Sequence, residues 1–151
     1  MREALNKTGR PIVFSLCGWN PWYAPRGKAL GNLWRIGPDN NGWKDILTNI
    51  NRNAPLADYA GPGGFNDPCL LIAEDATGRQ SITELQSRAQ FSMWAVMASP
   101  LLLSSNVRAL SPYNLETYSN AEVIRVEFLS GGWGVSMYRQ IPEGSILAVD
   151  S

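Results

Sequence analysis

Blocks of apolar and polar residues alternate along the chain and predict strands and helices in turn. Two continuous apolar runs bounded by turn residues, 12–17 and 100–104, are typical of strands buried on both faces. Residues 30–36 form a strand-like run, and a further short strand is expected within residues 63–72. The pattern therefore predicts four strands of a parallel sheet.

Helical periodicity fills the intervals between these strands. The pattern Ser81-Ile-Thr-Glu84 predicts a capping box at the start of one helix, and a short last helix is expected to begin near Asn120. An earlier helix is predicted by apolar residues spaced i, i+3, i+4, i+7, namely Trp43, Ile46, Leu47 and Ile50. The stripe expected on the capped helix comprises Leu85, Ala89, Met93 and Val96, widened by Phe91 and Trp94.

The order of elements limits the architecture to two choices. The tail of a helix over residues 1–7 precedes four strand–loop–helix units, and alternation over residues 132–149 predicts an antiparallel hairpin. Four such units make half of an eight-stranded barrel or an open doubly wound sheet, and no GxGxxG follows a strand to favour a dinucleotide fold. In either architecture the loops that follow the strands share one face, where ligand chemistry is located.

Composition excludes several classes of function. Lys+Arg and Asp+Glu number 13 each with no basic cluster, so neither nucleic acid nor an anionic membrane is expected as a partner. The absence of histidine excludes Ser-His and Cys-His nucleophiles and most zinc sites. No apolar run approaches transmembrane length, and Met1 opens a polar helix end rather than a signal peptide. Cys17 and Cys69 are either paired or free.

Arg35 and Asp39 are the first candidates for chemistry, because one strand ends in the arginine and the carboxylate follows four residues later. A guanidinium offers a planar fork of donors to hydroxyl groups, although aspartate is also a routine turn residue. Trp19 and Trp22 lie in a loop rich in glycine and proline. They suit stacking on the apolar face of a sugar, while core packing explains most tryptophans.

Six motifs occur in the order, and at roughly the spacing, found in one enzyme family. They are Ala4-Leu-Asn-Lys-Thr-Gly-Arg-Pro-Ile, Ser15-Leu-Cys-Gly-Trp, Asn32-Leu-Trp-Arg, Ala60-Gly-Pro-Gly-Gly-Phe-Asn-Asp-Pro, Phe91-Ser-Met-Trp-Ala-Val-Met-Ala-Ser-Pro-Leu-Leu-Leu and Ser119-Asn-Ala-Glu-Val-Ile. The chain resembles glycoside hydrolase family 27, the α-galactosidase and α-N-acetylgalactosaminidase family. The resemblance implies an α/β fold: residues 1–126 as strands five to eight of a (β/α)8 TIM barrel, and residues 127–151 as the first strands of an antiparallel β domain.

The resemblance also implies an activity and a set of site residues. The family hydrolyses terminal α-galactosides with retention, which needs two carboxylates about 5–5.5 Å apart and no metal or organic cofactor. Asp39 matches the acid/base, for which burial would favour the protonated form and a nearby arginine the ionised form. Arg35 matches the sugar-binding arginine. The further substrate-binding positions are Gly18, Trp19, Asn20, Trp22 and Cys69.

The chain departs from the family at three places. No residue matches the nucleophile, an aspartate in a Lys-Tyr/Phe-Asp motif on the fourth barrel strand. Gly18 stands where relatives commonly read Cys-Glu-Trp, and Cys69 stands where they read Asn-Asp-Pro-Asp-Met. A thiol accepts hydrogen bonds more weakly than a carboxylate does, so sugar affinity is expected to be reduced.

Three interpretations follow. The first is an α-galactosidase-like hydrolase acting on galactose-containing carbohydrate, nearly inactive as this chain alone. The second is a non-catalytic half barrel that binds sugar and pairs with another half, another chain or itself as a homo-oligomer. The third is a fragment without independent function. Galactose, N-acetylgalactosamine and arabinopyranose stay open as sugars, and the family implies a secreted, vacuolar or lysosomal location.

Overall fold

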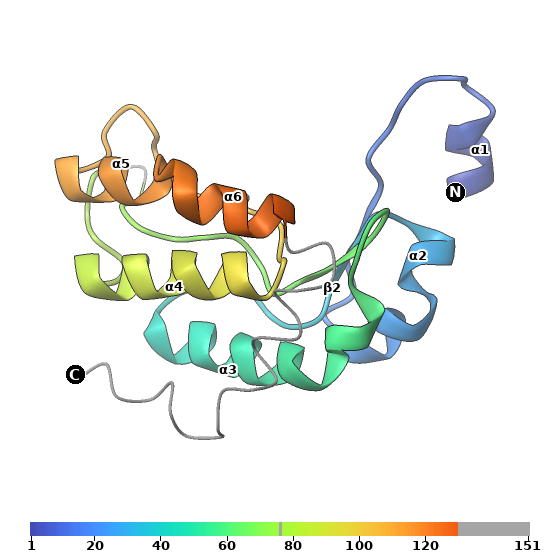
Figure 1. The fold of residues 1–151 in the computed structure, drawn as a ribbon, viewed down its shortest axis with the longest axis horizontal. Helices are drawn as coiled ribbons and strands as arrows, with labels where there is room; N and C mark the ends of the chain where they lie inside the picture. Colours follow the sequence, from blue (N-terminus) through green and yellow to red (C-terminus); the bar gives the residue numbers. More distant parts are fainter. Residues whose placement is uncertain (76, 130–151) are drawn as a thin grey trace.

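A computed structural model describes residues 1–75 and 77–129 and contains a parallel sheet among helices (Figure 1). The three strands are β1 (Ser15–Leu16), β2 (Leu33–Arg35) and β3 (Phe65–Asp67), in the spatial order β1-β2-β3. An isolated parallel bridge joins Leu71 to Leu103 beyond β3. The parallel α/β class expected from the sequence is confirmed.

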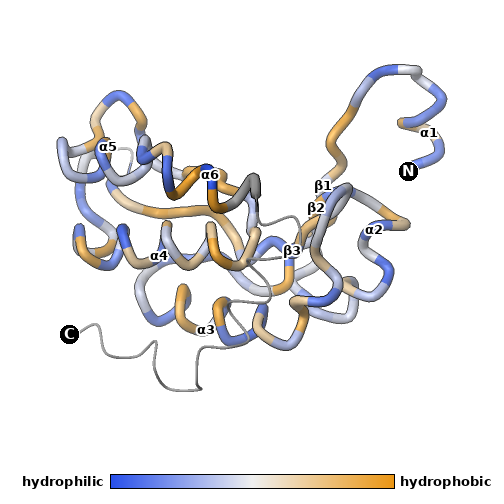
Figure 2. The backbone as a smooth tube through the Cα atoms, in the orientation of Figure 1, coloured by the Kyte–Doolittle hydropathy of each residue, from blue (hydrophilic) through white to orange (hydrophobic). Residues whose placement is uncertain are grey.

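Helices cover the sheet and enclose its apolar residues. α4 packs against α5 and α6, which lie side by side with it, whereas α1 stands away from the sheet (Figure 1). Hydrophobic and hydrophilic residues alternate along α4 and α6 (Figure 2). The bounds are α1 (Arg2–Asn6), α2 (Gly27–Leu30), α3 (Trp43–Asn53), α4 (Glu84–Val96), α5 (Pro112–Tyr118) and α6 (Ala121–Leu129), with 3-10 helices η1 (Pro21–Arg26) and η2 (Ala54–Tyr59).

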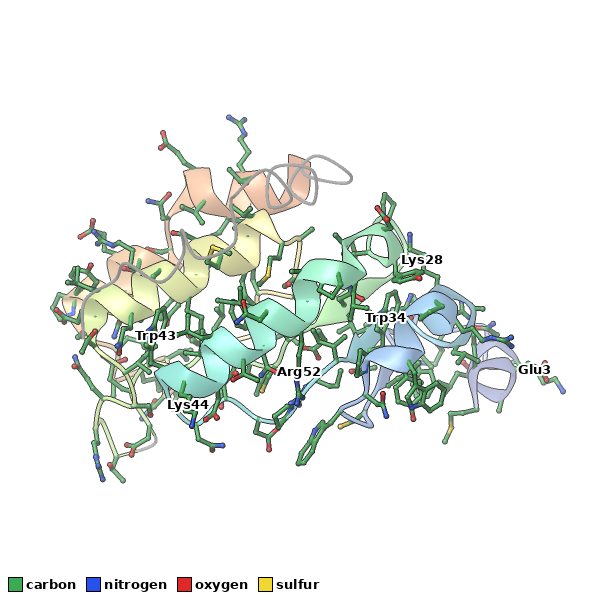
Figure 3. The ribbon with its side chains drawn as sticks, turned by 90° about the horizontal axis from the view of Figure 1, so that it is seen from below. Glu3, Lys28, Trp34, Trp43, Lys44 and Arg52 are labelled. Atoms are coloured by element: carbon green, nitrogen blue, oxygen red, sulfur yellow. The ribbon has the colours of Figure 1, made fainter. Side chains whose placement is uncertain are left out.

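Trp34 in β2 fixes the sheet to its neighbours. The side chain is fully buried, and its Nε1 donates a 2.6 Å hydrogen bond to Oδ1 of Asn66 in β3. The ring also lies against two glycines: a Cβ added at Gly27 would be 2.2 Å from ring atom Cδ2, and one at Gly64 would be 2.7 Å from Cζ3. Figure 3 shows Trp34 beside Lys28 of α2. Only residues without a Cβ allow this close approach.

The first strand is shorter and more exposed than the sequence predicts. Ile12 and Val13 are 42% and 74% exposed, and pairing is confined to β1. The expectation of burial on both faces is wrong here because β1 is the edge of the sheet and has a neighbour on one side only. The fourth expected strand is likewise reduced to the bridge at Leu103, with Leu102 49% exposed.

The predicted helix α4 is present, but its cap and its buried face differ from the prediction. The capping box joins Thr83 and Gln86, because the Thr83 hydroxyl accepts from the Gln86 N–H and Gln86 Oε1 accepts from the Thr83 N–H. Leu85 is 66% exposed, so its assignment to the core is wrong. The buried residues of the helix are Ser87, Gln90, Phe91, Trp94 and Ala95.

Of the other elements predicted from the sequence, some are confirmed and some lie outside the described residues, and two helices were not predicted. The helix predicted from Trp43 and the one near Asn120 are confirmed as α3 and α6, and β3 lies within the predicted range. The helices α2 and α5 were not predicted. Cys17 and Cys69 are both free. The hairpin at 132–149 lies outside the described residues, as does nearly all of the predicted domain 127–151.

A buried carboxylate joins the loop after Leu71 to helix α5. Glu74 is 3% exposed, and its Oε1 accepts from the Ser111 N–H at 3.0 Å and from Asn114 Nδ2 at 2.9 Å. Burial alone would raise the pKa of Glu74, but these hydrogen bonds outweigh it and the pKa is lowered from the ordinary 4.5.

Within the described residues, no helix is long and apolar enough to span a membrane.

Substituting Gly27 tests the packing of Trp34. Gly27→Ala is expected to lower the free energy of unfolding by about 3 kcal/mol, the upper end for an overpacked core, because its Cβ overlaps the indole. Urea denaturation measures the change. Gly42→Ala is the matched control, since a Cβ at Gly42 meets nothing within 4 Å and costs less than about 1 kcal/mol as a changed helix cap. Equal losses in the two variants would contradict the packing account.

The lowered pKa of Glu74 predicts a pH-dependent loss of stability. A depressed pKa in the folded state stabilises the fold above pH 4.5, and that contribution disappears as the pH falls below this value. Glu74→Gln is therefore expected to cost about 1 kcal/mol at pH 7 and progressively less in acid. Unfolding curves of both proteins between pH 7 and acid measure the difference. Glu116→Gln, whose side chain is 79% exposed, is the control for the substitution itself.

Candidate active site

The carboxyl ends of the parallel strands bring the candidate residues to one edge of the sheet. Arg35 at the end of β2 pairs in register with Asp67 at the end of β3. Cys17 and Gly18 follow directly on the last residue of β1, so the 17–22 loop leaves from the same edge. The shared edge expected from the sequence is the place where a parallel α/β fold holds ligand.

Arg35 and Asp39 form an ion pair beside this edge. Arg35 Nη2 donates to Asp39 Oδ1 at 2.9 Å and to the Gly37 carbonyl at 3.1 Å. The arginine side chain is 13% exposed and the aspartate side chain is 58% exposed. Asp39 therefore has the arginine contact expected from the sequence, whereas its side chain is only slightly buried. The carboxylate is exposed to solvent, and the hydrogen bond from the guanidinium orients it.

The pKa values around the pair reflect burial and neighbouring charge. Burial alone would lower the pKa of Arg35, but the hydrogen bond to Asp39 and the nearby carboxylates outweigh it and raise that pKa. The guanidinium therefore stays charged throughout the accessible pH range. Asp67 is 5% exposed, and burial raises its pKa despite the hydrogen bond from Cys69 and the charge of Arg35.

Cys69 lies next to the Arg35–Asp39 ion pair. Its backbone has φ = 82°, a left-handed conformation that is uncommon for residues other than glycine, and its N–H donates to Asp67 Oδ1 at 2.9 Å. The hydrogen bond closes a turn from Asp67 to Cys69. The Cys69 Sγ lies 4.0 Å from Asp39 Oδ1 and accepts from the Asn40 N–H at 3.4 Å. Residue 69 thus contacts the candidate acid/base directly.

Buried amides hold this irregular segment in place. Asn40 Nδ2 donates to the carbonyls of Pro68 at 3.3 Å and Leu70 at 3.0 Å, and Asn49 Nδ2 of α3 donates to Asn40 Oδ1 at 2.8 Å. From α4, Trp94 Nε1 donates to the Cys69 carbonyl at 3.0 Å. Sequence reasoning missed all three as parts of the site. Asparagine on an apolar helix face, as at position 49, is the signal that could have indicated a buried polar contact.

The loop after β1 presents its aromatic residues to solvent. Trp19 is 49% exposed with φ = 55°, and Trp22 is 62% exposed and stacks on Tyr23 with ring centroids 4.1 Å apart. Asn20 caps η1, since its Oδ1 accepts from the Trp22 N–H at 3.2 Å. A Cβ at Gly18 would be 2.5 Å from the Tyr23 ring. In the described part of the chain, hydrogen bonds join Arg35, Asp39 and Cys69 but do not reach this loop.

The available side chains define the chemistry open to the site. Among the described residues, no group of three or more His, Cys, Asp or Glu is placed to hold a metal ion. What the edge offers is a solvent-facing carboxylate, a charged fork of donors and exposed indole faces. These are groups that bind sugar hydroxyls and the apolar faces of pyranose rings.

Comparison with known proteins identifies the family. The melibiase family model described as "Alpha galactosidase A" matches residues 1–128. Alpha-galactosidase 3 of Arabidopsis thaliana is 43% identical over 130 residues, which cover 83% of this chain and 28% of that protein. Alpha-N-acetylgalactosaminidase of Gallus gallus is 34% identical, covering 99% of this chain and 38% of that protein. The chain belongs to the α-galactosidase family, glycoside hydrolase family 27.

Solved structures agree with this assignment. The α-galactosidase MEL1 of Saccharomyces cerevisiae superimposes with a TM-score of 0.71 at 31% identity, covering 83% of this chain and 32% of that one. The GH27 β-L-arabinopyranosidase of Geobacillus stearothermophilus gives a TM-score of 0.75 at 25% identity, covering 83% and 32%. The structural neighbours are TIM-barrel enzymes of this family. The chain spans about a third of the length of these relatives, from 28% to 38%.

The amide of Asn40 gives a test of how the site is held. Asn40→Ala removes two hydrogen bonds to the buried Pro68 and Leu70 carbonyls and is expected to lower the free energy of unfolding by about 2–3 kcal/mol. The Cys69 thiol, now 5% exposed, should then react faster with a disulfide reagent such as DTNB. Asn41→Ala is the control, because Asn41 is exposed. Unchanged labelling of Cys69 in Asn40→Ala would contradict this role.

Proposed function

We propose that this chain carries the acid/base half of a retaining α-galactosidase-type site. The observation that carries the proposal is the 2.9 Å contact between Arg35 and Asp39 at the carboxyl edge of a GH27 sheet. Asp39 acts as the acid/base that protonates the leaving oxygen, and Arg35 binds the sugar. The substrate is a carbohydrate with a terminal α-linked galactose, and the two-carboxylate reaction needs neither metal nor organic cofactor.

The geometry supports these two roles. Asp39 is 58% exposed, so a leaving-group oxygen has access to its carboxyl group. Arg35 Nη2 is committed to Asp39 and Gly37, and Nε is buried, whereas Nη1 makes no hydrogen bond within the described residues. A guanidinium has five donor N–H groups, so Arg35 retains the capacity to bind sugar hydroxyls while it holds Asp39.

The second carboxylate has to come from outside these 151 residues. No position matches the Lys-Tyr/Phe-Asp motif of the nucleophile, and a retaining reaction needs a carboxyl group about 5–5.5 Å from Asp39. Residues 1–126 would then supply strands five to eight of the barrel, and residues 127–151 would begin the β domain. A chain of these residues alone is expected to bind sugar without turning it over.

A non-catalytic sugar-binding half barrel is the second candidate. The open edge of β1 favours it, because Ile12 and Val13 beside that edge are 42% and 74% exposed. Unpaired strand edges attract further strands, so the half barrel would pair with a second half or with its own copy. Its location would be secreted, vacuolar or lysosomal, as the resemblance implies, with neither nucleic acid nor membrane as a partner.

The sugar itself is set by positions at which this chain differs from the family pattern. The matched relatives include an α-N-acetylgalactosaminidase and a β-L-arabinopyranosidase as well as α-galactosidases. Gly18 and Cys69 alter two substrate-binding positions, and Trp19, Asn20 and Trp22 follow Gly18 in the exposed loop after β1. Replacing a carboxylate by a thiol at position 69 is proposed to weaken galactose binding.

Galactose titration and an aryl α-galactoside together test the proposal. The purified chain is expected to bind galactose, to lose about tenfold in affinity in Arg35→Ala because a charged donor is removed, and to release no aryl group above background. Arg79→Ala is the matched control, because Arg79 is an exposed arginine on another loop. Calorimetry and absorbance report the two quantities.

Three outcomes would contradict parts of the proposal. Turnover that Asp39→Asn abolishes would overturn the expectation of inactivity and show that a carboxylate within these residues serves as the nucleophile. Binding without turnover that also survives Arg35→Ala would place the sugar elsewhere and overturn the assigned site. A monomer in light scattering that shows no heat of binding would remove the sugar-binding module.

A further inference from the structure

The turn between Asp39 and helix α3 contains the dipeptide Asn41-Gly42, and no other Asn-Gly occurs in the sequence. Asparagine is a heat-labile residue, and a following glycine has no Cβ to hinder the approach of its main-chain nitrogen to the side-chain amide. α3 begins directly afterwards at Trp43, which Figure 3 labels together with Lys44. A reactive dipeptide therefore lies close in sequence to the proposed acid/base.

Both reacting groups of this dipeptide are accessible. Asn41 is exposed, and within the described residues its side-chain Nδ2 makes one hydrogen bond, a 3.3 Å donation to the Asp39 carbonyl. Gly42 is extended, with φ = −175° and ψ = −178°, and a Cβ placed on it would meet nothing within 4 Å. The Gly42 N–H donates no hydrogen bond in residues 1–75 and 77–129. Neither packing nor hydrogen bonding therefore occupies the nitrogen that would react.

The neighbouring Asn40 is protected where Asn41 is open. Asn40 is 7% exposed, its Nδ2 donates to the Pro68 and Leu70 carbonyls, and its Oδ1 accepts from Asn49. The residue that follows it has a side chain, which hinders attack by the next main-chain nitrogen. The two asparagines form a matched pair within one turn, one buried and one exposed.

We propose that Asn41 is a site of spontaneous deamidation through a cyclic imide. The main-chain nitrogen of Gly42 forms a bond to Asn41 Cγ, the Cγ–Nδ2 bond breaks, and Nδ2 leaves as ammonia with the proton that Gly42 loses. Water then adds to either carbonyl carbon of the imide and reopens the ring, giving aspartate or isoaspartate. The reaction consumes water alone and changes no oxidation state. It does not depend on the proposed function.

Either product changes the charge of the turn, and one also changes the main chain. The formal net charge of the chain falls from 0 to −1, because a neutral amide becomes a carboxylate. That carboxylate cannot donate to the Asp39 carbonyl, and it lies near Asp45, whose Oδ2 accepts from the Asn41 N–H at 3.1 Å. Isoaspartate also adds one main-chain atom between Asn40 and α3. Because Asn40 holds the segment that contains Cys69, this product should loosen the packing of the thiol.

Incubation of the full chain at mildly alkaline pH, followed by peptide mass spectrometry, tests the site. Trypsin cuts after Arg35 and Lys44, so residues 36–44 form one peptide that contains both asparagines. This peptide should become heavier by the difference between an amide and a carboxylic acid, with the change at Asn41 and not at Asn40. Gly42→Ala is the matched control: the new Cβ fits the structure but hinders closure of the imide, so the change should be far slower.

The same reaction in urea measures how much the fold restrains it. In the folded chain the rate at residue 41 should be within about tenfold of the rate in urea, because an exposed turn with few contacts opens at little cost. A folded rate far below this range would overturn the proposal. So would an unchanged mass at residue 41, or equal rates in wild type and Gly42→Ala.

Thiol labelling separates the two products. DTNB should react first with Cys17, which is exposed, and then with Cys69, which is 5% exposed. In the isoaspartyl fraction the second phase should be several times faster than in fresh protein. Asn41→Asp has the charge without the extra main-chain atom, so it should keep the slow second phase. A slow second phase in the isoaspartyl fraction would overturn the predicted loosening around Cys69.

Discussion

The contact between Trp34 and Asn66 is the interaction on which the site depends. Its 2.6 Å hydrogen bond joins β2 to β3 inside a fully buried core, and Gly27 and Gly64 leave room for the indole on either side. The next residue along each strand is Arg35 or Asp67, and these two pair in register. A one-residue slip would turn both charged side chains to the opposite face. Burial of Trp34 therefore decides which face carries the chemistry.

The part of the site outside the strands is held by polar side chains. The segment 68–70 leaves the regular ladder, so its buried carbonyls need other donors, and Asn40, Gln90 and Trp94 supply them. This explains why α4 buries Gln90 and exposes Leu85, at 66%. An unmet carbonyl in the core costs about 1–3 kcal/mol, similar to what an exposed leucine forfeits, so the exchange is close to neutral in free energy. The left-handed backbone of Cys69, and with it the thiol contact to Asp39, depends on those hydrogen bonds.

Local pattern predicted the elements whose stability is local, and it failed where partners lie far along the chain. The periodicity of α3 and the cap near Asn120 follow from neighbouring residues, and Arg35 and Asp39 meet because they are four residues apart at a strand end. The exposure of Val13 follows from the edge position of β1, which no local window contains. The donors to segment 68–70 come from the loop after β2 and from α4, so their roles emerge only from tertiary packing.

Gly18 and Cys69 illustrate how a family site changes while its scaffold is retained. Cys69 contacts Asp39, whereas Gly18 lies in the loop after β1, and each position has a physical reason that involves a second residue. Gly18 is glycine because Tyr23 fills its side-chain space, and Cys69 is a small, buried residue because Asp39 and Asn40 contact its sulfur. Under the proposed function, substitutions compensated in this way leave Arg35 in contact with Asp39 and alter other groups near the sugar. The expected consequence is a changed preference among sugars rather than a lost acid/base.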